Sequence, residues 1–518
     1  MNDERKPWLI GCALALLAFV LIGFGLWLEL GGSLSSLAPA TSPGTATPTP
    51  IRPTFDTPVA PTSTPVQEPS MTPSATPSAT PSPTPTPTPI PTVVSTHMGL
   101  GVNYPINYPD PVMAELGFDW FKVFSSPDKR FPYRVLRRLD VRGVDLEDME
   151  KWAQSVADEA VRQAEYTEAW EIGNEPNLGA SFGWGAPPDP QQYTEVLCTA
   201  YERIKAADPT AIIVSGGLAP VGRVPHTWDG HQGYCAPELG CPDYYQDERA
   251  FLREMMEAGA GDCFDAFGYH PYGFGAPYDA SPLEEPCAST GFCFRSVETI
   301  RRILVEEFGV EKPIWATEFG WILDPREVDR GECWDHPAFS AFQGQVVTPQ
   351  EQAINVRGAY EWAELNYPWM ETMFLFNYGF YAESSCHQMG FFDVKGRLAE
   401  GSLRALPLRG MPSEPYWSGD GVLEIEAGAT DIVTGTFQLG NRFPEPLEWS
   451  AALDQGPPFL ELPETSGDSS EPLAFTVDPS QVEPGRYTAT IGVTVTSKLI
   501  VPVVEGPDQL TVTVQIGD

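Results

Sequence analysis

Short β-like runs and amphipathic stretches alternate along the middle of the chain, from about His97 to Leu406. The stretches Tyr193–Ala207 and Glu298–Phe308 have the apolar spacing of helices. Eight runs have the character of strands: Gly99–Tyr104, Phe118–Phe124, Val135–Val141, Thr167–Gly173, Ala211–Gly217, Asp265–Tyr272, Pro313–Trp321 and Met373–Tyr378. Eight strands that alternate with helices predict an α/β fold, a (β/α)₈ TIM barrel.

The second unit of this barrel is expected to be irregular. Only about ten residues, Ser125–Arg134, separate the second run from the third, and two of them are prolines. Proline lacks the N–H that a helix interior needs, and so short a connection leaves little room for a helix. We therefore expect a loop in place of the second helix.

After Leu406 the pattern changes to alternating strands without helices, punctuated by proline. The strand-like runs are Gly421–Glu426, Ile432–Leu439, Leu473–Val477, Tyr487–Val495 and Gln509–Ile516. This pattern predicts an immunoglobulin-like β-sandwich of about 100 residues. We assign residues 97–410 to the barrel and residues 411–518 to the sandwich.

The beginning of the chain contains an almost unbroken apolar run, Trp8–Leu28. About 21 residues are enough to cross a bilayer core of roughly 30 Å as a helix. Arg5 and Lys6 precede the run and the next basic residue is Arg52, which predicts a single-pass membrane protein with its N-terminus in the cytoplasm and its barrel outside. The alternative is a secreted protein whose signal peptide is cleaved at Ala38-Pro39-Ala40.

A tract of proline, threonine and serine extends from about Thr41 to Thr92. Such a composition cannot bury apolar area and favours extended polyproline conformations. We expect a disordered stalk over residues 35–96, preceded by a cytoplasmic tip and transmembrane anchor over residues 1–34.

Composition narrows the class of ligand. The chain has 518 residues, a formal net charge of −39 and a pI near 4.4, whereas proteins that bind nucleic acid carry a basic footprint. We therefore exclude nucleic acid, and a neutral glycan suits this charge better than an anionic one. The 14 Trp, 18 Tyr and 27 Phe are enough to fill a large core and also to line a sugar-binding cleft.

Eight of the nine cysteines lie after the apolar run, in what should be an oxidising compartment. Their spacing favours three disulfides and leaves the partners of Cys198 and Cys263 open: Cys235–Cys241, Cys287–Cys293 and Cys333–Cys386. No C-x-x-C pair or H-E-x-x-H helix occurs, so we expect no metal site. No cofactor is expected either.

Two strand-like segments end in a glutamate. Trp170–Asn177 reads W-E-I-G-N-E-P-N and contains Glu175, and Ile314–Trp321 reads I-W-A-T-E-F-G-W and contains Glu318. In each, the glutamate shares its side of the strand with a small residue, while bulky neighbours such as Trp315 are expected on the outside of the barrel. Two carboxyls delivered from two strand ends are what hydrolysis of a glycosidic bond needs.

Residues 97–406 resemble the retaining glycoside hydrolases of clan A, with family 39 and the family 5-like hydrolases as the nearest subgroups. In that clan the acid/base ends the fourth barrel strand as Asn-Glu-Pro and the nucleophile ends the seventh, which are the strands that carry Glu175 and Glu318 here. The resemblance implies that Glu175 is the general acid/base and Glu318 the nucleophile. Retention needs the two carboxyls about 5–5.5 Å apart, one protonated and the other ionised.

The resemblance also implies residues that bind substrate. Asn174 matches the clan position that contacts the sugar 2-hydroxyl, and His270 and Tyr272 end the sixth strand, where the clan has a tyrosine near the nucleophile. Trp321 is a candidate stacking platform or else a core residue. Three loop tryptophans are further candidate subsites: Trp184, Trp228 and Trp334.

The chain departs from the clan at two places. Clan members commonly carry an arginine near the end of the second strand, where this chain has Lys122, and arginines including Arg138 surround the third strand, so the cation that reaches the nucleophile stays open. The eighth strand offers Asn377 and Tyr378 where a tryptophan is frequent. Glu171, on the fourth strand, is expected to be a barrel-interior carboxylate and not a third catalyst.

These features predict a membrane-anchored, extracellular glycoside hydrolase that cleaves β-glycosidic bonds of an oligo- or polysaccharide. The alternative is a noncatalytic cell-surface protein for glycan binding or adhesion, although binding alone does not need a carboxyl pair. The sandwich, with Leu447-Glu448-Trp449-Ser450 and Pro484-Gly485-Arg486-Tyr487, resembles a BACON-like immunoglobulin-type module, which implies a spacer or a glycan-binding part. The sequence leaves the oligomeric state open.

Overall fold

The computed structural model describes residues 93–104, 111–180, 182–337, 339–379, 386–504 and 506–517. The predicted membrane span and the predicted stalk up to residue 92 lie outside these residues. Among the helices that are described, none is both long and apolar enough to cross a membrane. Residues 93–96 belong to the folded part, because β1 (Val93–Val94) pairs in parallel with β14 (Leu408–Arg409) and the Ser95 hydroxyl donates to Glu364.

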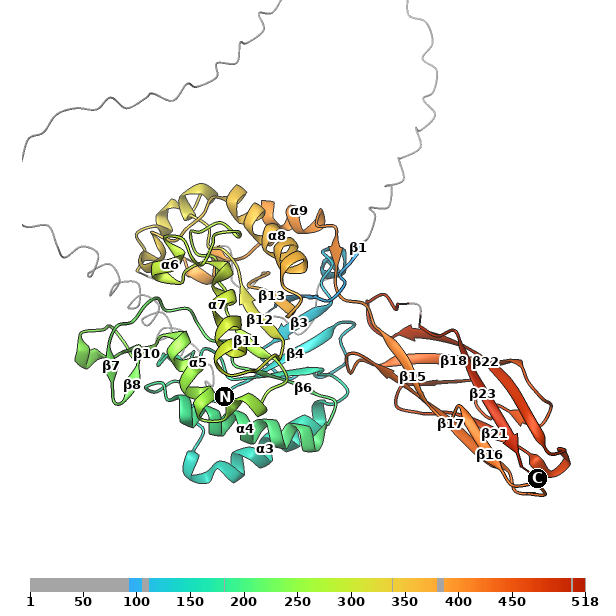
Figure 1. Ribbon diagram of the computed structural model, residues 1–518. Coiled ribbons are helices and arrows are strands. Elements are labelled where there is room, and N and C mark those ends of the chain that lie inside the picture. The colour runs from blue at the N-terminus through green and yellow to red at the C-terminus, as the bar shows by residue number, and fades with distance from the viewer. Residues whose placement is uncertain are drawn as a thin grey trace, which may run out of the picture. The chain divides into compact units, whose positions relative to one another are not determined.

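Eight parallel strands form one sheet, which confirms the predicted barrel (Figure 1). In chain order they are β2 (Gly99–Asn103), β3 (Trp120–Val123), β4 (Arg134–Leu139), β5 (Ala169–Ile172), β6 (Ile212–Ser215), β11 (Phe267–Tyr269), β12 (Ile314–Phe319) and β13 (Met370–Leu375). Neighbours in the sheet follow chain order, with β13 beside β2. Parallel bridges from Val214 to Ala266 and from Leu218 to Tyr269 join β6 to β11 and close the barrel.

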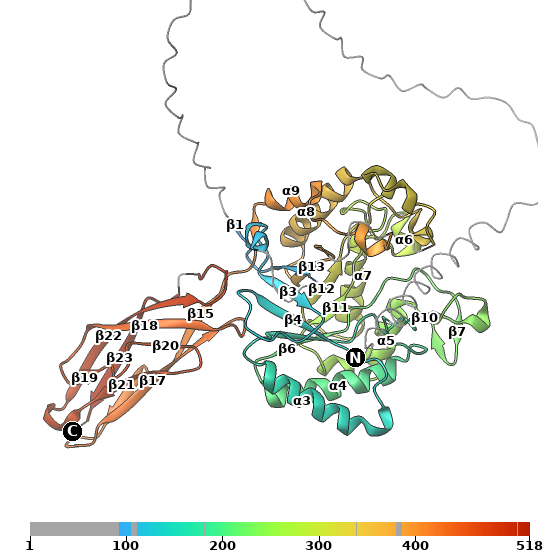
Figure 2. The same cartoon turned by 180° about the vertical axis from the view of Figure 1, so that it is seen from behind.

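Helices occupy most of the connections between these strands. They are α2 (Val112–Glu115), α3 (Met149–Gln163), α4 (Pro190–Ala207), α5 (Glu248–Glu257), α6 (Cys287–Thr290), α7 (Val297–Arg302) and α8 (Pro349–Asn366), and α9 (Leu398–Arg404) follows the last strand. Helices α3 and α4 pack side by side, as do α8 and α9 (Figures 1 and 2). Residues 124–133, between β3 and β4, form a loop, as their two prolines predicted.

Local sequence explains where the long helices begin. Helix α4 starts after Asp189, whose carboxylate accepts from the backbone N–H groups of Gln191 and Gln192. Helix α8 starts with a capping box between Thr348 and Glu351. These side chains satisfy N–H groups that have no partner in the first turn of a helix.

Two apolar layers hold the barrel together. The outer layer packs strand residues such as Trp170 and Ile172 against the surrounding helices. The inner layer fills the barrel near the amino ends of the strands, and it consists of Trp120, Leu136, Ala169, Val214, Ala266, Trp315, Phe374, Met411 and Phe443. Met411 and Phe443 come from the chain that follows the barrel, so this later segment completes the barrel interior.

The predicted side of Trp315 was wrong. Trp315 lies in the inner layer with its ring centroid 4.9 Å from that of Trp120, whereas Ala316 belongs to the outer layer. The reason is a bulge in β12: Ala316 pairs with Met373 and Phe319 with Leu375, so two residues of β12 oppose one of β13. A bulge changes which side the following residues face. Glu318 therefore reaches the barrel mouth although the simple alternation would place it with Ala316.

Residues after the barrel form two packed antiparallel-rich sheets, which confirms a β-sandwich. One sheet has the order β15 (Pro415–Gly419), β17 (Val433–Asn441), β21 (Leu473–Val477), β19 (Leu460–Glu461). The other has the order β16 (Val422–Ile425), β23 (Gln509–Ile516), β22 (Gly485–Ser497), β18 (Leu447–Gln455), β20 (Ser466–Asp468). The strand-like runs predicted from the sequence do not include β18, although its buried residues Leu447, Trp449 and Ala451 alternate with exposed ones.

The part of the chain that the structure describes contains four disulfides, and all of them lie in the barrel. The structure forms the three pairs that spacing favoured and also joins the two cysteines whose partners were open: Cys235–Cys241, Cys287–Cys293, Cys333–Cys386 and Cys198–Cys263. The last pair links α4 to the segment after α5. The Cys333–Cys386 bond joins the loops that follow β12 and β13.

Replacing Trp315 with alanine should lower the free energy of unfolding by about 3–5 kcal/mol, because a fully buried aromatic side chain leaves a cavity. Chemical denaturation followed by far-ultraviolet circular dichroism measures this loss. The half-buried Trp228 provides the control, and Trp228→Ala should cost clearly less, because less apolar surface is buried there. Equal losses in the two variants would contradict an interior position for Trp315.

Candidate active site

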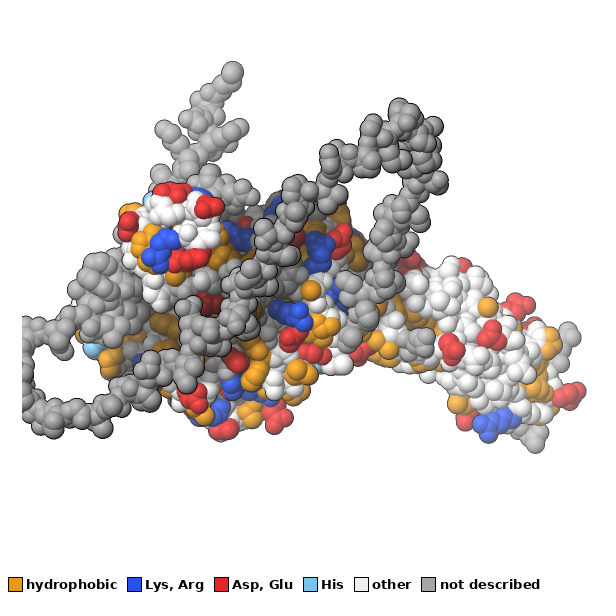
Figure 3. Space-filling model, turned by 90° about the horizontal axis from the view of Figure 1, so that it is seen from above, with side chains coloured by type: hydrophobic (Ala, Val, Ile, Leu, Met, Phe, Trp, Pro, Cys, Tyr) orange, Lys and Arg blue, Asp and Glu red, His pale blue; other side chains and the backbone are white. Residues whose placement is uncertain are grey.

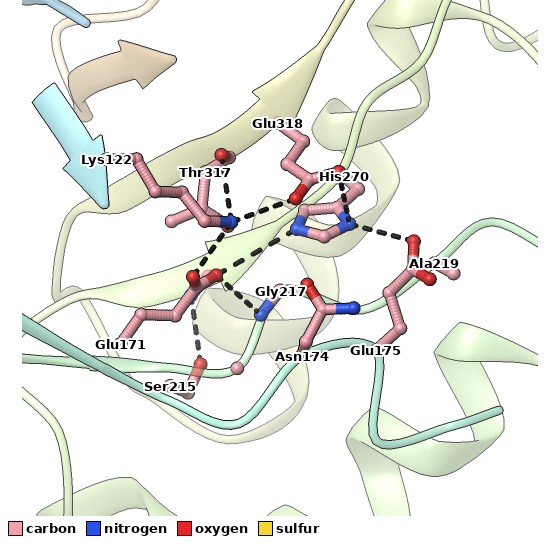
Figure 4. A network of polar contacts seen from close by, with 12 residues as sticks. Lys122, Glu171, Asn174, Glu175, Ser215, Gly217, Ala219, His270, Thr317 and Glu318 are labelled. Carbon is pink, nitrogen blue, oxygen red and sulfur yellow. Dashed lines mark hydrogen bonds and ion pairs between the residues drawn. The ribbon is translucent and has the colours of Figure 1, made fainter. Parts of the chain in front are cut away.

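The candidate active site lies at the carboxyl ends of the barrel strands (Figure 4). Glu318 is the fifth residue of β12, and Glu175 follows β5 by three residues. The chain turns sharply between β5 and Glu175, since Gly173 has φ +90° and Glu175 has φ +43°. The Glu175 N–H donates to the carbonyl oxygen of Gly217 at 3.0 Å. A non-glycine residue held in the left-handed region is often found at a functional site.

The two carboxyls face each other with His270 beside them. One oxygen of Glu175, one oxygen of Glu318 and a ring nitrogen of His270 all lie within 4.8 Å of one another. The Nδ1 atom of His270 is 3.0 Å from Glu175 Oε1 and 3.8 Å from Glu318 Oε2. All three side chains are buried. Two carboxyls this close cannot both be charged without a strong penalty, so their protonation states should differ.

Glu318 is held in its ionised form by two donors. Lys122 Nζ lies 3.0 Å from Glu318 Oε1, and the Tyr272 hydroxyl donates to Glu318 Oε2 at 2.7 Å. Burial favours the neutral carboxyl, but Lys122, the charge of His270 and the Tyr272 hydrogen bond outweigh it and keep the pKa of Glu318 below its ordinary value. The sequence left the cation beside this glutamate open, and the structure places Lys122 there.

Glu175 is biased toward its protonated form. Burial raises the pKa of Glu175 above its ordinary value, and the charge of Glu318 adds to this effect, while His270 opposes it. The pair is therefore asymmetric: one carboxyl keeps its proton in the pH range in which the other has lost its own. A proton donor beside an anionic nucleophile is the arrangement used in the cleavage of glycosidic bonds.

Glu171 completes a chain of alternating charges. Its Oε2 atom is 2.8 Å from Lys122 Nζ and its Oε1 atom is 3.9 Å from His270 Nε2. Burial opposes the charge, yet Lys122 and His270 lower the pKa of Glu171 to about 2. Burial also opposes protonation of His270, yet Glu318, Glu171 and Glu175 raise its pKa to about 9. At neutral pH, therefore, His270 is a cation, and Glu171 and Glu318 are anions.

The distances between Glu175, His270 and Glu318 would admit a metal ion, but the existing contacts of these side chains oppose one. Glu175, His270 and Glu318 converge closely enough to share an ion, but Lys122 and Tyr272 already engage both oxygens of Glu318, and His270 donates to Glu175. An ion would have to compete with a buried ammonium group for the same carboxylate. A second converging set, around Glu332, contains two cysteines that are joined in a disulfide.

Two further predicted substrate-binding residues, Asn174 and Arg138, have partners other than Glu175 and Glu318. Asn174 donates to the Phe182 carbonyl at 3.0 Å, and its Oδ1 atom is buried with no hydrogen-bond donor among the described residues. Arg138 does not serve Glu318 as Lys122 does, because its guanidinium lies over the Phe124 ring at 4.6 Å.

Three predicted substrate contacts are packed into the protein. Trp321 has 0% exposure and donates to the Ala276 carbonyl at 2.7 Å, so it is a core residue and its ring is not offered as a stacking platform. The side-chain amide of Asn377 donates to the Met389 carbonyl at 2.9 Å. Tyr378 is buried in the outer layer, with its ring 6.1 Å from that of Tyr104.

Two aromatic side chains near Tyr272, Phe274 and Phe292, were not among the residues that the sequence indicated. Phe274, two residues after Tyr272, has φ +52° and is half-buried. Its ring is 4.5 Å from that of Phe292 and 6.3 Å from that of Tyr272. Of the loop tryptophans, Trp334 lies under the Arg326 guanidinium at 3.5 Å and remains half-buried.

No protein-family model and no curated protein sequence matches the chain. Among solved structures, a glucosidase from Croceicoccus marinus has 10% identity, a TM-score of 0.40, and coverage of 78% of this chain and 94% of its own. The Ignisphaera aggregans GH53 catalytic domain has 14% identity, a TM-score of 0.37, and coverage of 62% and 99%. The β-glucuronidase of Parabacteroides merdae has 8% identity and a TM-score of 0.37; the match covers 81% of this chain but only 50% of that enzyme. Identities and scores this low assign neither an activity nor a substrate to this chain.

Replacing Tyr272 with phenylalanine should raise the pKa of Glu318 by about 1–2 units, because a hydrogen bond to a charged group contributes about 1.5–3 kcal/mol. Infrared titration of the carboxyl bands measures the shift, and the Glu318→Gln variant assigns the band. Tyr269→Phe is the matched control, since the Tyr269 hydroxyl pairs with Ser296 at 3.0 Å. A Glu318 pKa that is the same in wild type and Tyr272→Phe would contradict the role of this hydroxyl.

Proposed function

We propose that this chain is a retaining glycosidase that hydrolyses β-glycosidic bonds of a neutral glycan. The observation that carries the proposal is the pair Glu175 and Glu318. A carboxylate oxygen of Glu175 lies within 4.8 Å of one of Glu318, and the pKa values of the two carboxyls are shifted in opposite directions. Inverting enzymes need a wider gap, roughly 6.5–9.5 Å, to admit a water molecule between carboxyl and sugar. The close spacing therefore favours retention.

In the first half-reaction, Glu318 attacks the anomeric carbon while Glu175 gives its proton to the departing glycosidic oxygen. The bond between the anomeric carbon and that oxygen breaks, and an ester bond forms between the sugar and Glu318. Lys122 and Tyr272 orient the carboxylate for attack. Because an ester carries no charge, the pKa of Glu175 falls once Glu318 has reacted.

In the second half-reaction, Glu175 acts as the base. It takes a proton from water, whose oxygen attacks the anomeric carbon, and the ester bond to Glu318 breaks. Glu318 is again a carboxylate and Glu175 is again protonated. His270 Nδ1 lies 3.0 Å from Glu175 Oε1, so the imidazole can orient this carboxyl in both half-reactions.

The substrate class follows from charge. The formal net charge is −39, and acidic and basic side chains are interspersed on the face seen in Figure 3. An anionic polysaccharide would be repelled by the protein as a whole, so a neutral glycan is the better substrate.

The buried acceptor Asn174 Oδ1 provides a hydrogen-bond partner for a sugar hydroxyl. Within clan A we place the barrel nearest to family 39 and the family 5-like hydrolases.

We also propose that the enzyme acts outside the cell, held to the membrane by Trp8–Leu28 and raised from it by the Pro/Thr/Ser tract. The four disulfides support an oxidising location. The sandwich then serves as an immunoglobulin-type, BACON-like spacer. Recovery of the full-length protein in the soluble fraction of cells, without cleavage of its N-terminus, would reject the anchor.

Glu318→Gln should reduce hydrolysis of aryl β-glycosides by at least about a thousandfold, because the amide cannot form the glycosyl ester. Steady-state release of the aryl group measures this loss. Glu202→Gln, on the exposed surface of α4, is the control and should keep the wild-type rate. Turnover in Glu318→Gln close to that of the control would reject the nucleophile assignment.

Glu175→Ala should lose activity according to the leaving group. Substrates with good leaving groups need little protonation, so their first half-reaction survives, whereas substrates with poor leaving groups should be lost by several orders of magnitude. Azide should restore turnover of the activated substrates and yield the β-glycosyl azide. Equal losses on both kinds of substrate would argue against the acid/base role.

The stereochemistry of the product separates the proposal from its rivals. Proton NMR of the first product should show the β-anomer, since two inversions give net retention. A first-formed α-anomer would reject the retaining mechanism. Tight glycan binding without turnover across a broad substrate panel would instead favour the noncatalytic glycan-binding alternative.

A further inference from the structure

Glu171 is a buried carboxylate that the two half-reactions do not use. Its exposure is 0%, and it lies on β5, four residues before Glu175. Lys122, which is also fully buried, stands between Glu171 and Glu318, at 2.8 Å from the former and 3.0 Å from the latter. Figure 4 shows this ammonium group between the two carboxylates. Because Glu171 has no exposed surface and its oxygens face Lys122 and His270, it is not placed to touch a substrate.

Glu171 also contacts the other cation of the cluster. The ring of His270 lies between Glu171 and Glu175, with Nε2 3.9 Å from Glu171 Oε1 and Nδ1 3.0 Å from Glu175 Oε1. The backbone N–H of Gly217 donates to Glu171 Oε1 at 3.3 Å. A Cβ atom at Gly217 would fall 2.3 Å from His270 Nε2, so only glycine leaves room for the imidazole here.

The charges of the cluster sum to zero in each stage of the proposed reaction. At rest, Lys122 and His270 are positive, Glu171 and Glu318 are negative, and Glu175 is neutral. In the glycosyl-enzyme, Glu318 is a neutral ester and Glu175 is negative, so the sum is unchanged. Without Glu171 the buried cluster would carry a net positive charge in both stages, and an uncompensated buried charge is strongly unfavourable.

We propose that Glu171 is a positioning residue whose negative charge balances Lys122 and keeps His270 protonated, and so fixes the pH range in which the Glu175–Glu318 pair works. The inference rests on the glycosidase function proposed above and deepens it. The carboxylate acts only through its neighbours: it transfers no proton and forms no bond to the sugar.

Several titratable groups face this cluster and must be considered in any pH dependence. They are Lys122 from β3, Arg138 from β4, Glu175 after β5, Tyr193 from α4, His270 and Tyr272 after β11, and Glu318 from β12. Arg138 pairs with Glu171 in the sheet, but its guanidinium lies over Phe124. The pKa values of Tyr193 and Tyr272 are raised by burial, so both stay neutral in the working range.

The test is Glu171→Gln in the full-length protein. Removing one negative charge weakens proton binding by every group around it, so the pKa of His270 should fall from about 9 by about one unit or more. For the same reason, both limbs of the pH profile of kcat/KM should move to lower pH. Titration of the His270 imidazole by ¹⁵N NMR measures the first shift, and hydrolysis of an aryl β-glycoside measures the second.

Three further variants separate charge from simple destabilisation. Glu168→Gln removes a neighbouring buried carboxylate, which pairs with Arg130 and not with the cluster, so it should leave the His270 pKa and both limbs unmoved. Glu171→Asp keeps the charge and should shift the His270 pKa by less than half as much as Glu171→Gln. In Lys122→Met/Glu171→Gln one charge of each sign is removed, so the pKa of His270 should return toward the wild-type value.

The outcomes distinguish this inference from the proposed function. An unchanged His270 pKa in folded Glu171→Gln overturns the role of Glu171, whether or not the wild type hydrolyses glycosides. A lower melting temperature with unmoved limbs would also overturn it, since that is a structural role only. A wild type without any hydrolytic activity would reject the glycosidase, while the NMR titration would still decide whether Glu171 controls His270.

Discussion

One buried ammonium group shared by two carboxylates organises the mouth of the barrel. Lys122 neutralises Glu318 from one side and Glu171 from the other, so neither carboxylate is an isolated charge in a medium of low polarity. Since Glu318 can then remain ionised without exposure to water, Glu175 becomes the group that holds the proton. The pKa values of the two glutamates thus differ in part because Lys122 contacts Glu318 and not Glu175.

The barrel supplies the geometry of that contact. Lys122, Glu171 and Glu318 come from three strands, β3, β5 and β12, which a closed parallel sheet brings around one axis. The wide inner layer of tryptophan and phenylalanine below them excludes water from beneath the charges. Low polarity strengthens each ion pair and also makes each unpaired charge costly, which explains why cations and anions alternate here.

Much of this arrangement could be read from the sequence. The count of strand-like runs was enough to assign Glu175 to the fourth strand and Glu318 to the seventh, because strand order in such a barrel follows chain order. It also brought His270 and Tyr272 to the end of the sixth. The two prolines between β3 and β4 were enough to predict the missing helix.

The remaining details depend on distances across the barrel that a linear pattern does not contain. The bulge in β12, which follows Ala316, brings Glu318 to the barrel interior that Trp315 also faces, and alternation alone gives no sign of it. The choice of Lys122 over Arg138 depends on which side chain spans the interior. The sequence left Trp321 open as a sugar platform or a core residue, and the structure packs it beneath the Gly273 backbone, where a Cβ atom would be 1.9 Å from the indole.

The distribution of cysteine has a consequence for how the protein responds to reduction. Two of the four covalent cross-links lie within the connections after β6 and β11, and a third joins the loops after β12 and β13, whereas residues 411–518 contain no cysteine at all. The fourth cross-link ties α4 to the segment after α5. Reduction would thus remove covalent bonds from the barrel alone, most of them in loops that follow its strands, and would leave residues 411–518 chemically unchanged.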